Sequence, residues 1–260
     1  MHNAAMAVLG LPHRYFAFHV GAEDLADALR GARALGLGGL NLTVPHKVQA
    51  ASVVDRLAGS AKRLGAVNTV LFDGAALVGH NTDGFGFVAG LRELDPTPVE
   101  RAVVLGTGGA SLAIVDGLRE AFPGISITWV SRDGRRGGQL LGGVALAADY
   151  GSLDRALDGA DLLVNATTVG MRGGPSDFPS PVPVERLRPR ARVVDVVYPR
   201  VRDGLIDRAE AAGHLVQDGL PMLLWQGVRA LELWLGLERP PGLPSRVVQA
   251  MRDALDPQAP

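Results

Sequence analysis

Short apolar runs alternate along this chain with segments in which apolar residues recur at the helical period. Such alternation is typical of an α/β protein, in which helices cover the faces of a mostly parallel sheet. In the first part of the chain, the apolar runs predict strands at residues 15–19, 39–42, 67–72 and 77–81. The helical period predicts helices over residues 1–9, 22–35 and 60–64.

A second series of elements begins at Arg101, after Pro96-Thr97-Pro98. Two prolines in three residues cannot continue a helix, so we interpret this segment as a junction between domains. Strands are predicted at residues 102–105, 126–130, 162–165 and 192–196, with a helix over 110–121. Two more helices are predicted over residues 221–235 and 245–255, the second with Ser245 as its N-cap.

The composition is that of a globular protein. Hydrophobic residues make up 47% of the 260 residues, enough for the core of one large or two small α/β domains. The net charge of −1, without a basic block, gives no support to a nucleic-acid or membrane partner. No apolar run approaches the ~18 residues of a membrane span, and no signal peptide is evident, so we expect a cytoplasmic protein. Cysteine is absent, which excludes disulfides and thiol nucleophiles, and we expect no metal site.

A glycine-rich turn joins the strand predicted at residues 102–105 to the following helix. Its residues are Gly106, Thr107, Gly108, Gly109 and Ala110. Gly106 permits a tight turn, Gly108 allows the backbone to approach a pyrophosphate, and the helix N-terminus offers N–H groups to its charge. Ser111 stands where a third glycine is usual. The pattern predicts a dinucleotide site, and the alternative is an ordinary strand-to-helix turn.

The end of the next predicted strand carries Ser131-Arg132-Asp133, followed by Arg135 and Arg136. An acid at this position favours the ribose hydroxyls of NAD, whereas an arginine favours the 2′-phosphate of NADP. Arg132, assisted by Arg136, therefore favours NADP, while Asp133 leaves NAD possible. An ordinary charged turn is the alternative.

Three polar segments interrupt the apolar pattern of the first part, at residues 41–47, 65–69 and 79–84. Asparagine and threonine in turns usually bond to the backbone. Thr43 and Lys47, however, follow a strand end, where α/β sheets bind ligands. Only two of the 26 basic residues are lysine, and lysine, unlike arginine, can give up its proton at neutral pH. Lys47 and Asp83 are our candidates for a proton-handling pair, and we interpret His46 as structural.

Seven segments in collinear order resemble the shikimate dehydrogenases. They are residues 41–47 (N-L-T-V-P-H-K), 65–69 (G-A-V-N-T), 81–84 (N-T-D-G), 106–111 (G-T-G-G-A-S), 165–171 (N-A-T-T-V-G-M), 195–199 (D-V-V-Y-P) and 218–226 (D-G-L-P-M-L-L-W-Q). The resemblance implies an α/β fold with two domains. Residues 1–83 plus 219–260 would form a substrate domain with a mostly parallel sheet, and residues 84–218 an inserted Rossmann-like NADP-binding domain.

The resemblance also implies reversible reduction of 3-dehydroshikimate to shikimate by NADPH, in aromatic amino-acid biosynthesis, in a cleft between the domains. Lys47 and Asp83 would be the catalytic pair: the lysine protonates the alkoxide that hydride transfer leaves, and the aspartate orients it. The substrate would be held by Thr43, Asn68, Tyr198 and Gln226. The cofactor would be held by Gly106, Thr107, Gly108, Gly109, Ala110, Ser131, Arg132, Arg136, Thr167, Val196 and Gly219.

The chain departs from the family at its start. Family members open with a strand and a serine-containing loop that binds the substrate carboxylate, ahead of a segment like Met1-His2-Asn3. We therefore expect that Met1 is not the natural start, and that the chain without this strand is less stable and binds shikimate weakly.

Three alternatives remain at this point. One is a quinate/shikimate dehydrogenase with relaxed substrate or NAD use. A second is a non-catalytic ligand-binding homologue, although such a protein is expected to lose Lys47 or Asp83. A third is a folate-pathway dehydrogenase of similar architecture. For a shikimate dehydrogenase, we expect a small-molecule substrate, shikimate or 3-dehydroshikimate, and a monomer or homodimer.

Overall fold

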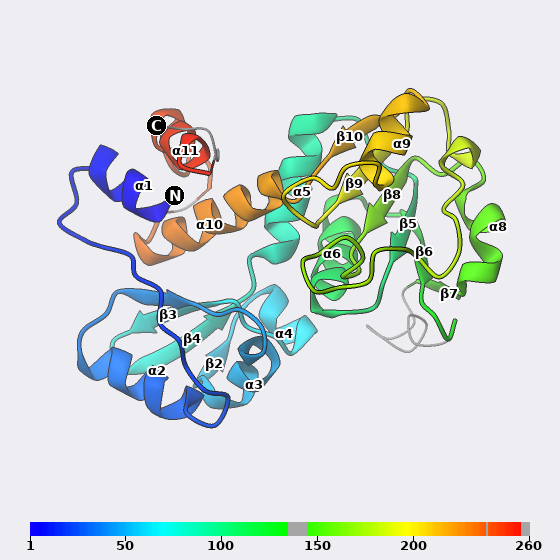
Figure 1. Cartoon of the computed structure of the whole chain (residues 1–260). Coiled ribbons are helices and arrows are strands. Elements are labelled where there is room, and N and C mark those ends of the chain that lie inside the picture. The colour runs from blue at the N-terminus through cyan, green and yellow to red at the C-terminus, as the bar shows by residue number, and fades with distance from the viewer. Residues whose placement is uncertain (135–144, 238, 256–260) are drawn as a thin grey trace. The chain divides into compact units, whose positions relative to one another are not determined.

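The computed structural model describes residues 1–134, 145–237 and 239–255, and the chain divides into two compact units (Figure 1). The first unit comprises Met1–Gly86 and Leu224–Pro260, and the second comprises Phe87–Leu223. The chain passes from one unit to the other inside helices α5 (Asp83–Leu94) and α10 (Leu220–Trp234). The limits expected from the sequence, 83/84 and 218/219, fall slightly earlier. The segment 96–98 lies inside the second unit, between α5 and the next strand.

The sheet of the first unit has four short strands in the order β1-β3-β4-β2. They are β1 (Gly39–Asn41), β2 (Arg56–Leu57), β3 (Thr69–Asp73) and β4 (Ala76–His80). Only Gly74 and Ala75 join β3 to β4, and a connection this short makes the strands antiparallel. β1 is also antiparallel to β3, whereas β2 is parallel to β4. This sheet is therefore mixed, which corrects the expectation that it is mostly parallel.

The strand predicted at residues 15–19 is not formed. The side chain of Asn3 forms hydrogen bonds with both backbone groups of Tyr15. Oδ1 of Asn3 accepts from the Tyr15 N–H at 2.7 Å, and Nδ2 donates to the Tyr15 carbonyl at 3.0 Å. Phe16 and Phe18 are 67% and 70% exposed. The prediction rested on aromatic content and alternation, and these favour a strand only where a neighbouring strand pairs with the backbone.

Three helices cover one face of this sheet: α2 (Leu25–Ala34), α3 (His46–Val53) and α4 (Ser60–Leu64). Their core residues are Leu25, Leu29, Ala50 and Ala61, which pack with Val67, Val70 and Leu77. Trp234 of α10 also contacts the sheet, donating from Nε1 to the carbonyl of Val70 at 3.1 Å. A side chain at Gly39 would overlap this indole, so the close approach of Trp234 requires glycine there.

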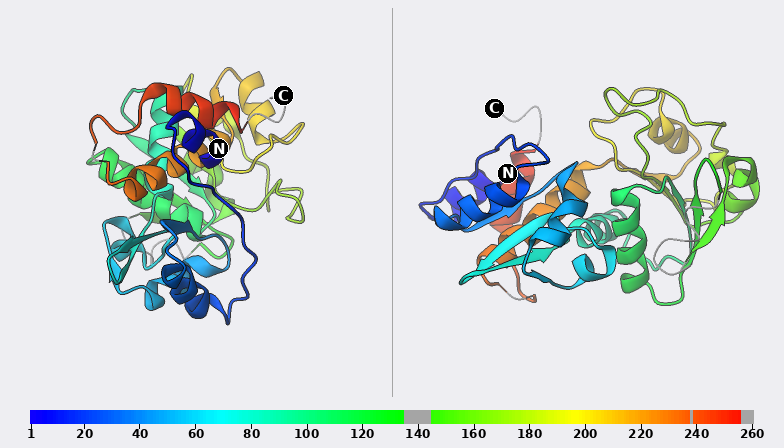
Figure 2. Two further views of the ribbon diagram at one scale, coloured as in Figure 1. Left: turned by 90° about the vertical axis from the view of Figure 1, so that its left-hand side faces the viewer. Right: turned by 90° about the horizontal axis from the view of Figure 1, so that it is seen from below.

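Helices α1 (His2–Val8) and α11 (Ser245–Asp253) lie side by side in the first unit, as Figures 1 and 2 show. Their apolar residues pack with those of α10 in one cluster formed by Ala5, Met6, Leu224, Val228, Leu231, Leu243, Val247 and Met251. The predicted cap of α11 is wrong by one residue. Pro244 is extended (ψ 143°) and its carbonyl already accepts from Val247, so Pro244 is the N-cap and Ser245 is the first helical residue.

The second unit is built on six parallel strands in the order β10-β9-β8-β5-β6-β7. They are β5 (Arg101–Leu105), β6 (Ser126–Val130), β7 (Leu146–Ala148), β8 (Leu162–Asn165), β9 (Arg192–Asp195) and β10 (Leu215–Gln217). Numbered along the chain from β5, the order reads 3-2-1-4-5-6, which is that of the Rossmann fold. The predicted α/β class with a Rossmann-like domain is confirmed.

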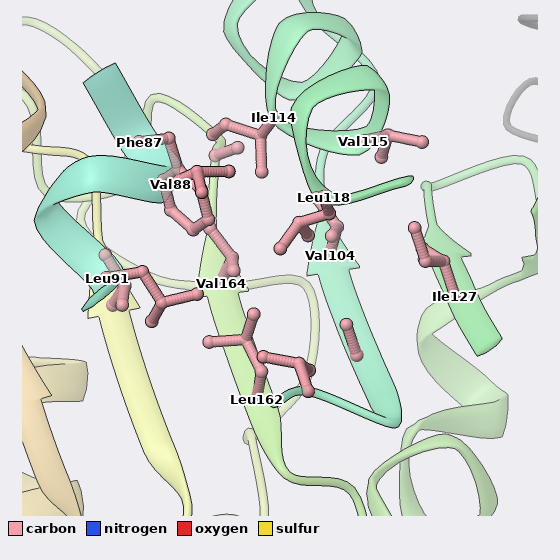
Figure 3. Packing of buried hydrophobic residues seen from close by; sticks show 14 of the residues in the cluster. Phe87, Val88, Leu91, Val104, Ile114, Val115, Leu118, Ile127, Leu162 and Val164 are labelled. Atoms are coloured by element: carbon pink, nitrogen blue, oxygen red, sulfur yellow. The ribbon is translucent and has the colours of Figure 1, made fainter. Parts of the chain in front are cut away.

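Helices cover both faces of this sheet (Figure 1). On one face α5 and α6 (Gly109–Ala121) pack on the strands, and Figure 3 shows Phe87, Leu91 and Leu118 among the side chains that meet Val104 and Val164. On the other face lie α8 (Leu153–Leu157), α9 (Leu205–Ala211) and the short 3₁₀ helices η2 (Tyr150–Ser152) and η3 (Val184–Arg186). Sheet strands buried on both faces explain the continuous apolar runs of this part of the sequence.

His2 makes the stability of the first unit depend on pH. Its ring lies 4.5 Å from that of Tyr15 and 5.3 Å from that of Trp234, centroid to centroid. Burial, helped by the N-terminal ammonium, lowers the pKa of His2 from 6.5 to about 4, against a hydrogen bond with Asn41 that raises it. The folded state therefore favours neutral His2, and this contribution is complete above pH 6.5 and lost as pH falls from 6.5 towards 4.

We expect the free energy of unfolding to fall by about 2 kcal/mol more in the native protein than in His2→Gln when pH drops from 7.5 to 5. Urea unfolding at the two pH values measures this difference. His19→Gln, which changes an exposed histidine, is the control. Equal pH dependence in His2→Gln and the native protein would show that His2 is not buried in its neutral form.

Candidate active site

Lys47 lies in the first turn of α3, just after β1 ends at Asn41. Its Nζ donates to Oδ2 of Asp83 at 2.7 Å, and the side chains of the two residues are 26% and 9% exposed. The structure thus joins the two candidate residues, 36 positions apart in the sequence, in one ion pair.

Asp83 is the first residue of α5, where the helix dipole favours a negative charge. Its backbone N–H donates to Oδ1 of Asn81 at 3.1 Å, which holds the start of the helix. Nδ2 of Asn68 donates to Oδ1 of Asp83 at 2.8 Å, while Lys47 occupies Oδ2. Each carboxylate oxygen therefore has its own donor, an arrangement that suits an ionised aspartate orienting an amine.

Asn68 is 2% exposed, and both ends of its amide are hydrogen-bonded. Besides the bond to Asp83, Nδ2 donates to Oγ1 of Thr82 at 3.0 Å. Oδ1 accepts from the backbone N–H of Thr82 and from Oγ1 of Thr69, each at 2.9 Å. The sequence suggested Asn68 as a substrate ligand, and in the structure its contacts are with these neighbouring side chains and backbone.

The other three expected substrate residues lie on separate segments. Thr43 is exposed in the turn after β1, where its carbonyl accepts from the N–H of His46 at 2.9 Å. Gln226 is half-buried on the part of α10 that belongs to the first unit. Tyr198 follows β9 in the second unit and is 47% exposed. Their contacts with a substrate stay predictions.

The glycine turn between β5 and α6 has one crowded and one open glycine. At Gly106, with φ +94°, a Cβ would lie 2.8 Å from Cγ2 of Thr167 and 2.9 Å from the carbonyl oxygen of Ala166. At Gly108, the N-cap of α6, nothing lies within 4 Å of a Cβ position. The first glycine is needed by the fold, and the second leaves the backbone at the helix N-terminus open to a ligand.

Ser111, where a third glycine is usual, lies in the first turn of α6 and bonds to the glycine turn. Its Oγ donates to the carbonyl of Gly106 at 2.5 Å, and the buried Nε1 of Trp129 lies 2.6 Å from both oxygens. The hydroxyl therefore ties the turn to strand β6, a contact that glycine could not make.

Gly106 and Thr167 stand at the point where the strand order reverses. β5 and β8 are neighbours in the sheet, and the connections that leave them run to opposite faces. In open α/β sheets, ligands bind at this point, outside the carboxyl ends of the strands. The structure thus brings two of the predicted cofactor residues together where the fold class binds nucleotides.

Val196 and Gly219 also lie together in the second unit. A Cβ at Gly219 would overlap the carbonyl oxygen of Val196 and lie 2.9 Å from Cδ1 of Tyr198. The segment after β9 and the start of α10 can be this close only because residue 219 is glycine. Two further expected cofactor residues are therefore adjacent.

The end of β6 carries Ser131, whose Oγ donates to Oδ1 of Asp133 at 2.9 Å. Arg132 is exposed, and its charge opposes the rise in the pKa of Tyr150 that burial causes. Asp133 thus turns back to the strand end, next to an arginine that faces solvent. Arg136 lies outside the described residues.

Sequence reasoning missed Asn165 and Asp195 as parts of this site. Asn165 is fully buried: its Oδ1 accepts from Oγ1 of Thr167 at 2.6 Å, and its Nδ2 donates to Oδ1 of Asp195 at 2.9 Å. Burial raises the pKa of Asp195, opposed by the N–H of Val197 and by Asn165, and the charge of Asp218 raises it further. A polar residue closing an apolar run was the signal that could have identified both.

Within the described ranges, no helix has the length and apolar content needed to cross a membrane.

Two family models match the chain. "Shikimate dehydrogenase substrate binding domain" matches residues 1–70, and "Shikimate 5'-dehydrogenase C-terminal domain" matches residues 219–255. Among curated proteins, the shikimate dehydrogenase (NADP(+)) of Geobacter metallireducens is 39% identical over 262 residues, covering 96% of this chain and 90% of that protein.

Solved structures agree with these matches. The shikimate 5-dehydrogenase of Thermus thermophilus, in complex with NADP(H) and shikimate, has a TM-score of 0.82 and 38% identity over 98% of this chain and 93% of its own. The ligand-free 5-ketofructose reductase of a Gluconobacter species has a TM-score of 0.81 and 35% identity, covering 97% and 92%.

The two glycines of the turn predict opposite effects of substitution. Gly106→Ala should lower the free energy of unfolding by about 1–3 kcal/mol, because the methyl group meets Thr167 at a left-handed backbone position. Gly108→Ala should leave stability within about 0.5 kcal/mol. It should instead weaken NADP binding, because the methyl group blocks the approach of the pyrophosphate.

Urea unfolding and a calorimetric titration with NADP measure the two effects. Native NADP affinity in a stable Gly108→Ala would show that the turn is only structural.

Proposed function

This chain belongs to the shikimate dehydrogenase family, and we propose that it catalyses the reversible, NADPH-dependent reduction of 3-dehydroshikimate to shikimate in aromatic amino-acid biosynthesis. The ion pair of Lys47 with Asp83 carries this proposal, because it supplies an anchored amine for the proton step. The relative from Geobacter metallireducens, at 39% identity, carries the name of this activity. A non-catalytic homologue is disfavoured, because both members of the pair are present.

The residues present fit a dinucleotide. The open backbone at Gly108, at the N-terminus of the 13-residue helix α6, suits a pyrophosphate. We assign cofactor binding to Gly106, Thr107, Gly108, Gly109, Ala110, Ser131, Arg132, Arg136, Thr167, Val196 and Gly219. When bound, the nicotinamide supplies the hydride that reduces the ketone.

Lys47 would handle the proton at the reacting oxygen. As an ammonium it stabilises and then protonates the alkoxide, and as a neutral amine it accepts the hydroxyl proton in the reverse direction. Asp83 keeps Nζ in place through its Oδ2 and balances the positive charge. Arginine could stabilise the alkoxide but could not exchange its proton at neutral pH.

The remaining proposed contacts are with the substrate's hydroxyls and carboxylate. We assign them to Thr43, Tyr198 and Gln226, and to Asn68 together with its neighbour Asp83. Apart from the Asp83 carboxylate, these groups are neutral donors and acceptors, as expected for a polyhydroxylated ring. For this role we propose a cytoplasmic monomer or homodimer.

The deciding experiment measures oxidation of shikimate and quinate with NADP and with NAD, and reduction of 5-ketofructose with NADPH. We expect shikimate with NADP to give the highest kcat/KM. Turnover of 5-ketofructose without turnover of shikimate would replace the proposed substrate while keeping the reaction class. Preferred use of quinate or NAD would favour a broader dehydrogenase.

Lys47→Ala should lower kcat for shikimate oxidation by roughly 10²–10⁴-fold, because a general acid–base group is lost. The KM for NADP should change little, since the assigned cofactor residues lie in the second unit. Lys47→Arg should also lower kcat for shikimate oxidation, because arginine keeps the positive charge but cannot transfer the proton. Lys62→Ala, at the other lysine, is the matched control. Near-native kcat in Lys47→Ala would remove the lysine from the mechanism.

Arg132→Ala should weaken NADP binding by about 1.5–3 kcal/mol, the cost of a lost charge-assisted contact, and NAD binding much less. Asp133→Thr should sharpen the preference for NADP by removing a negative charge near the 2′-phosphate. Titrations of both cofactors measure these differences, with the exposed Arg155→Ala as control. If Arg132→Ala weakens both cofactors equally, the arginine does not bind the 2′-phosphate.

A further inference from the structure

The three polar segments of the first unit contain residues that the proposed reaction does not use. Asn41, Thr69 and Thr82 come from separate segments and join Asn68 in one hydrogen-bond network. Thr69 and Thr82 are 0% and 2% exposed, so these bonds are shielded from water. We propose that Asn41, Thr69 and Thr82 are positioning residues, which hold the Asn68 amide in the one orientation that presents Nδ2 to Asp83. This inference rests on the proposed function of the Lys47–Asp83 pair.

A primary amide has a donor end and an acceptor end of nearly the same shape, so its surroundings decide which way it points. Neighbouring backbone groups determine the orientation first, because a backbone N–H can only donate and a backbone carbonyl can only accept. The N–H of Thr82 donates at 2.9 Å to one end of the Asn68 amide, and that end must be Oδ1. Nδ2 then faces Asp83.

A second path reaches the same end of the amide from Asn41. The backbone carbonyl of Asn68 can only accept, so the group of Asn41 that lies 3.2 Å from it is Nδ2. The same Nδ2 donates to Oγ1 of Thr69 at 3.1 Å. The proton of the Thr69 hydroxyl is thereby directed to Oδ1 of Asn68, 2.9 Å away. Tyr15 supports this orientation, because its hydroxyl donates to Oδ1 of Asn41 at 3.1 Å.

Thr82 completes the network on the other side. Its Oγ1 accepts one Nδ2 proton of Asn68 at 3.0 Å, which leaves the other proton for Oδ1 of Asp83 at 2.8 Å. A reversed amide would place an oxygen against the Asp83 carboxylate and an NH₂ group against the backbone N–H of Thr82. The direction of every bond thus converges on one result, a carboxylate anchored on Oδ1 with Oδ2 free to hold Lys47.

This anchoring matters because a lysine side chain is long and flexible. The hydrogen bond from Nζ to Asp83 limits the positions of the lysine side chain. It can do so only if the Asp83 carboxylate is itself held in place. A displacement of about 1 Å in a reacting group can cost about 10²-fold in rate. The network therefore acts on the proton step through Asp83, without contact with substrate.

Thr69→Val and Thr69→Ser test the proposal, since valine keeps the shape without the hydroxyl and serine keeps the hydroxyl without the methyl group. We expect Thr69→Val to lower kcat for shikimate oxidation by roughly 10-fold or more, with the KM for NADP unchanged. We expect Thr69→Ser to stay within about twofold of the native rate. A purely packing role predicts the opposite order, because serine leaves a cavity, and that order would overturn the proposal.

Ser52→Ala is the control. It deletes another hydroxyl of the first unit, one that donates to the backbone carbonyl of Gln49 at 2.8 Å. Its kcat should be native, and a loss equal to that of Thr69→Val would overturn the proposal. If Thr69→Val does not fold, the same comparison of Thr82→Val with Thr82→Ser decides.

A readout without turnover separates this inference from the proposed function. The ¹⁵N-correlated side-chain NH₂ signals of Asn68 should shift in Thr69→Val and not in Ser52→Ala. Unshifted signals in Thr69→Val would overturn the inference even in an active enzyme. If Thr69→Val shows these shifts but the native protein does not oxidise shikimate, only the proposed function is contradicted.

Discussion

Burying a primary amide costs free energy unless both of its ends are hydrogen-bonded, and each unit satisfies this constraint where a strand meets a loop. Asn68 adjoins the start of β3 and links it to the segment before α5, while Asn165 closes β8 and joins it to the end of β9. In both places the amide fixes the relative position of two chain segments. The candidate groups, Asp83 in one unit and Thr167 in the other, are the residues so fixed.

Close backbone approach is the complementary constraint in the second unit. Gly106 lies against Thr167, and Gly219 against Val196, with no space for a side chain at either glycine. The hydrogen bond from Thr167 to Asn165 fixes the position of the Thr167 side chain, which crowds Gly106. The buried amide and the two glycines therefore lie along one edge of the sheet, and an alanine at Gly106 would meet Ala166 and Thr167, just after β8.

The sequence predicted several elements whose limits the structure reproduces, including β6 (Ser126–Val130), β8 (Leu162–Asn165) and α4 (Ser60–Leu64). The prediction failed where hydrogen bonding with another segment decides the structure. Residues 15–19 have the composition of a strand, but the backbone N–H and carbonyl of Tyr15 are hydrogen-bonded to the side chain of Asn3. The parallel sheet expected in the first unit is mixed, because pairing direction depends on the short link at Gly74.

The pairing of Lys47 with Asp83 could be anticipated from motif content, since each residue type is unusual in its segment. The role of Asn68 could not be, because it depends on the direction of hydrogen bonds among residues far apart in the sequence. Both Nδ2 protons are engaged, one by Thr82 and one by Asp83. A substrate hydroxyl can accept from Asn68 only by replacing the neutral Thr82 hydroxyl, because giving up the bond to the charged carboxylate costs more. The proposed binding of substrate at Asn68 is therefore compatible with anchoring of Asp83, because one neutral hydrogen bond would replace another.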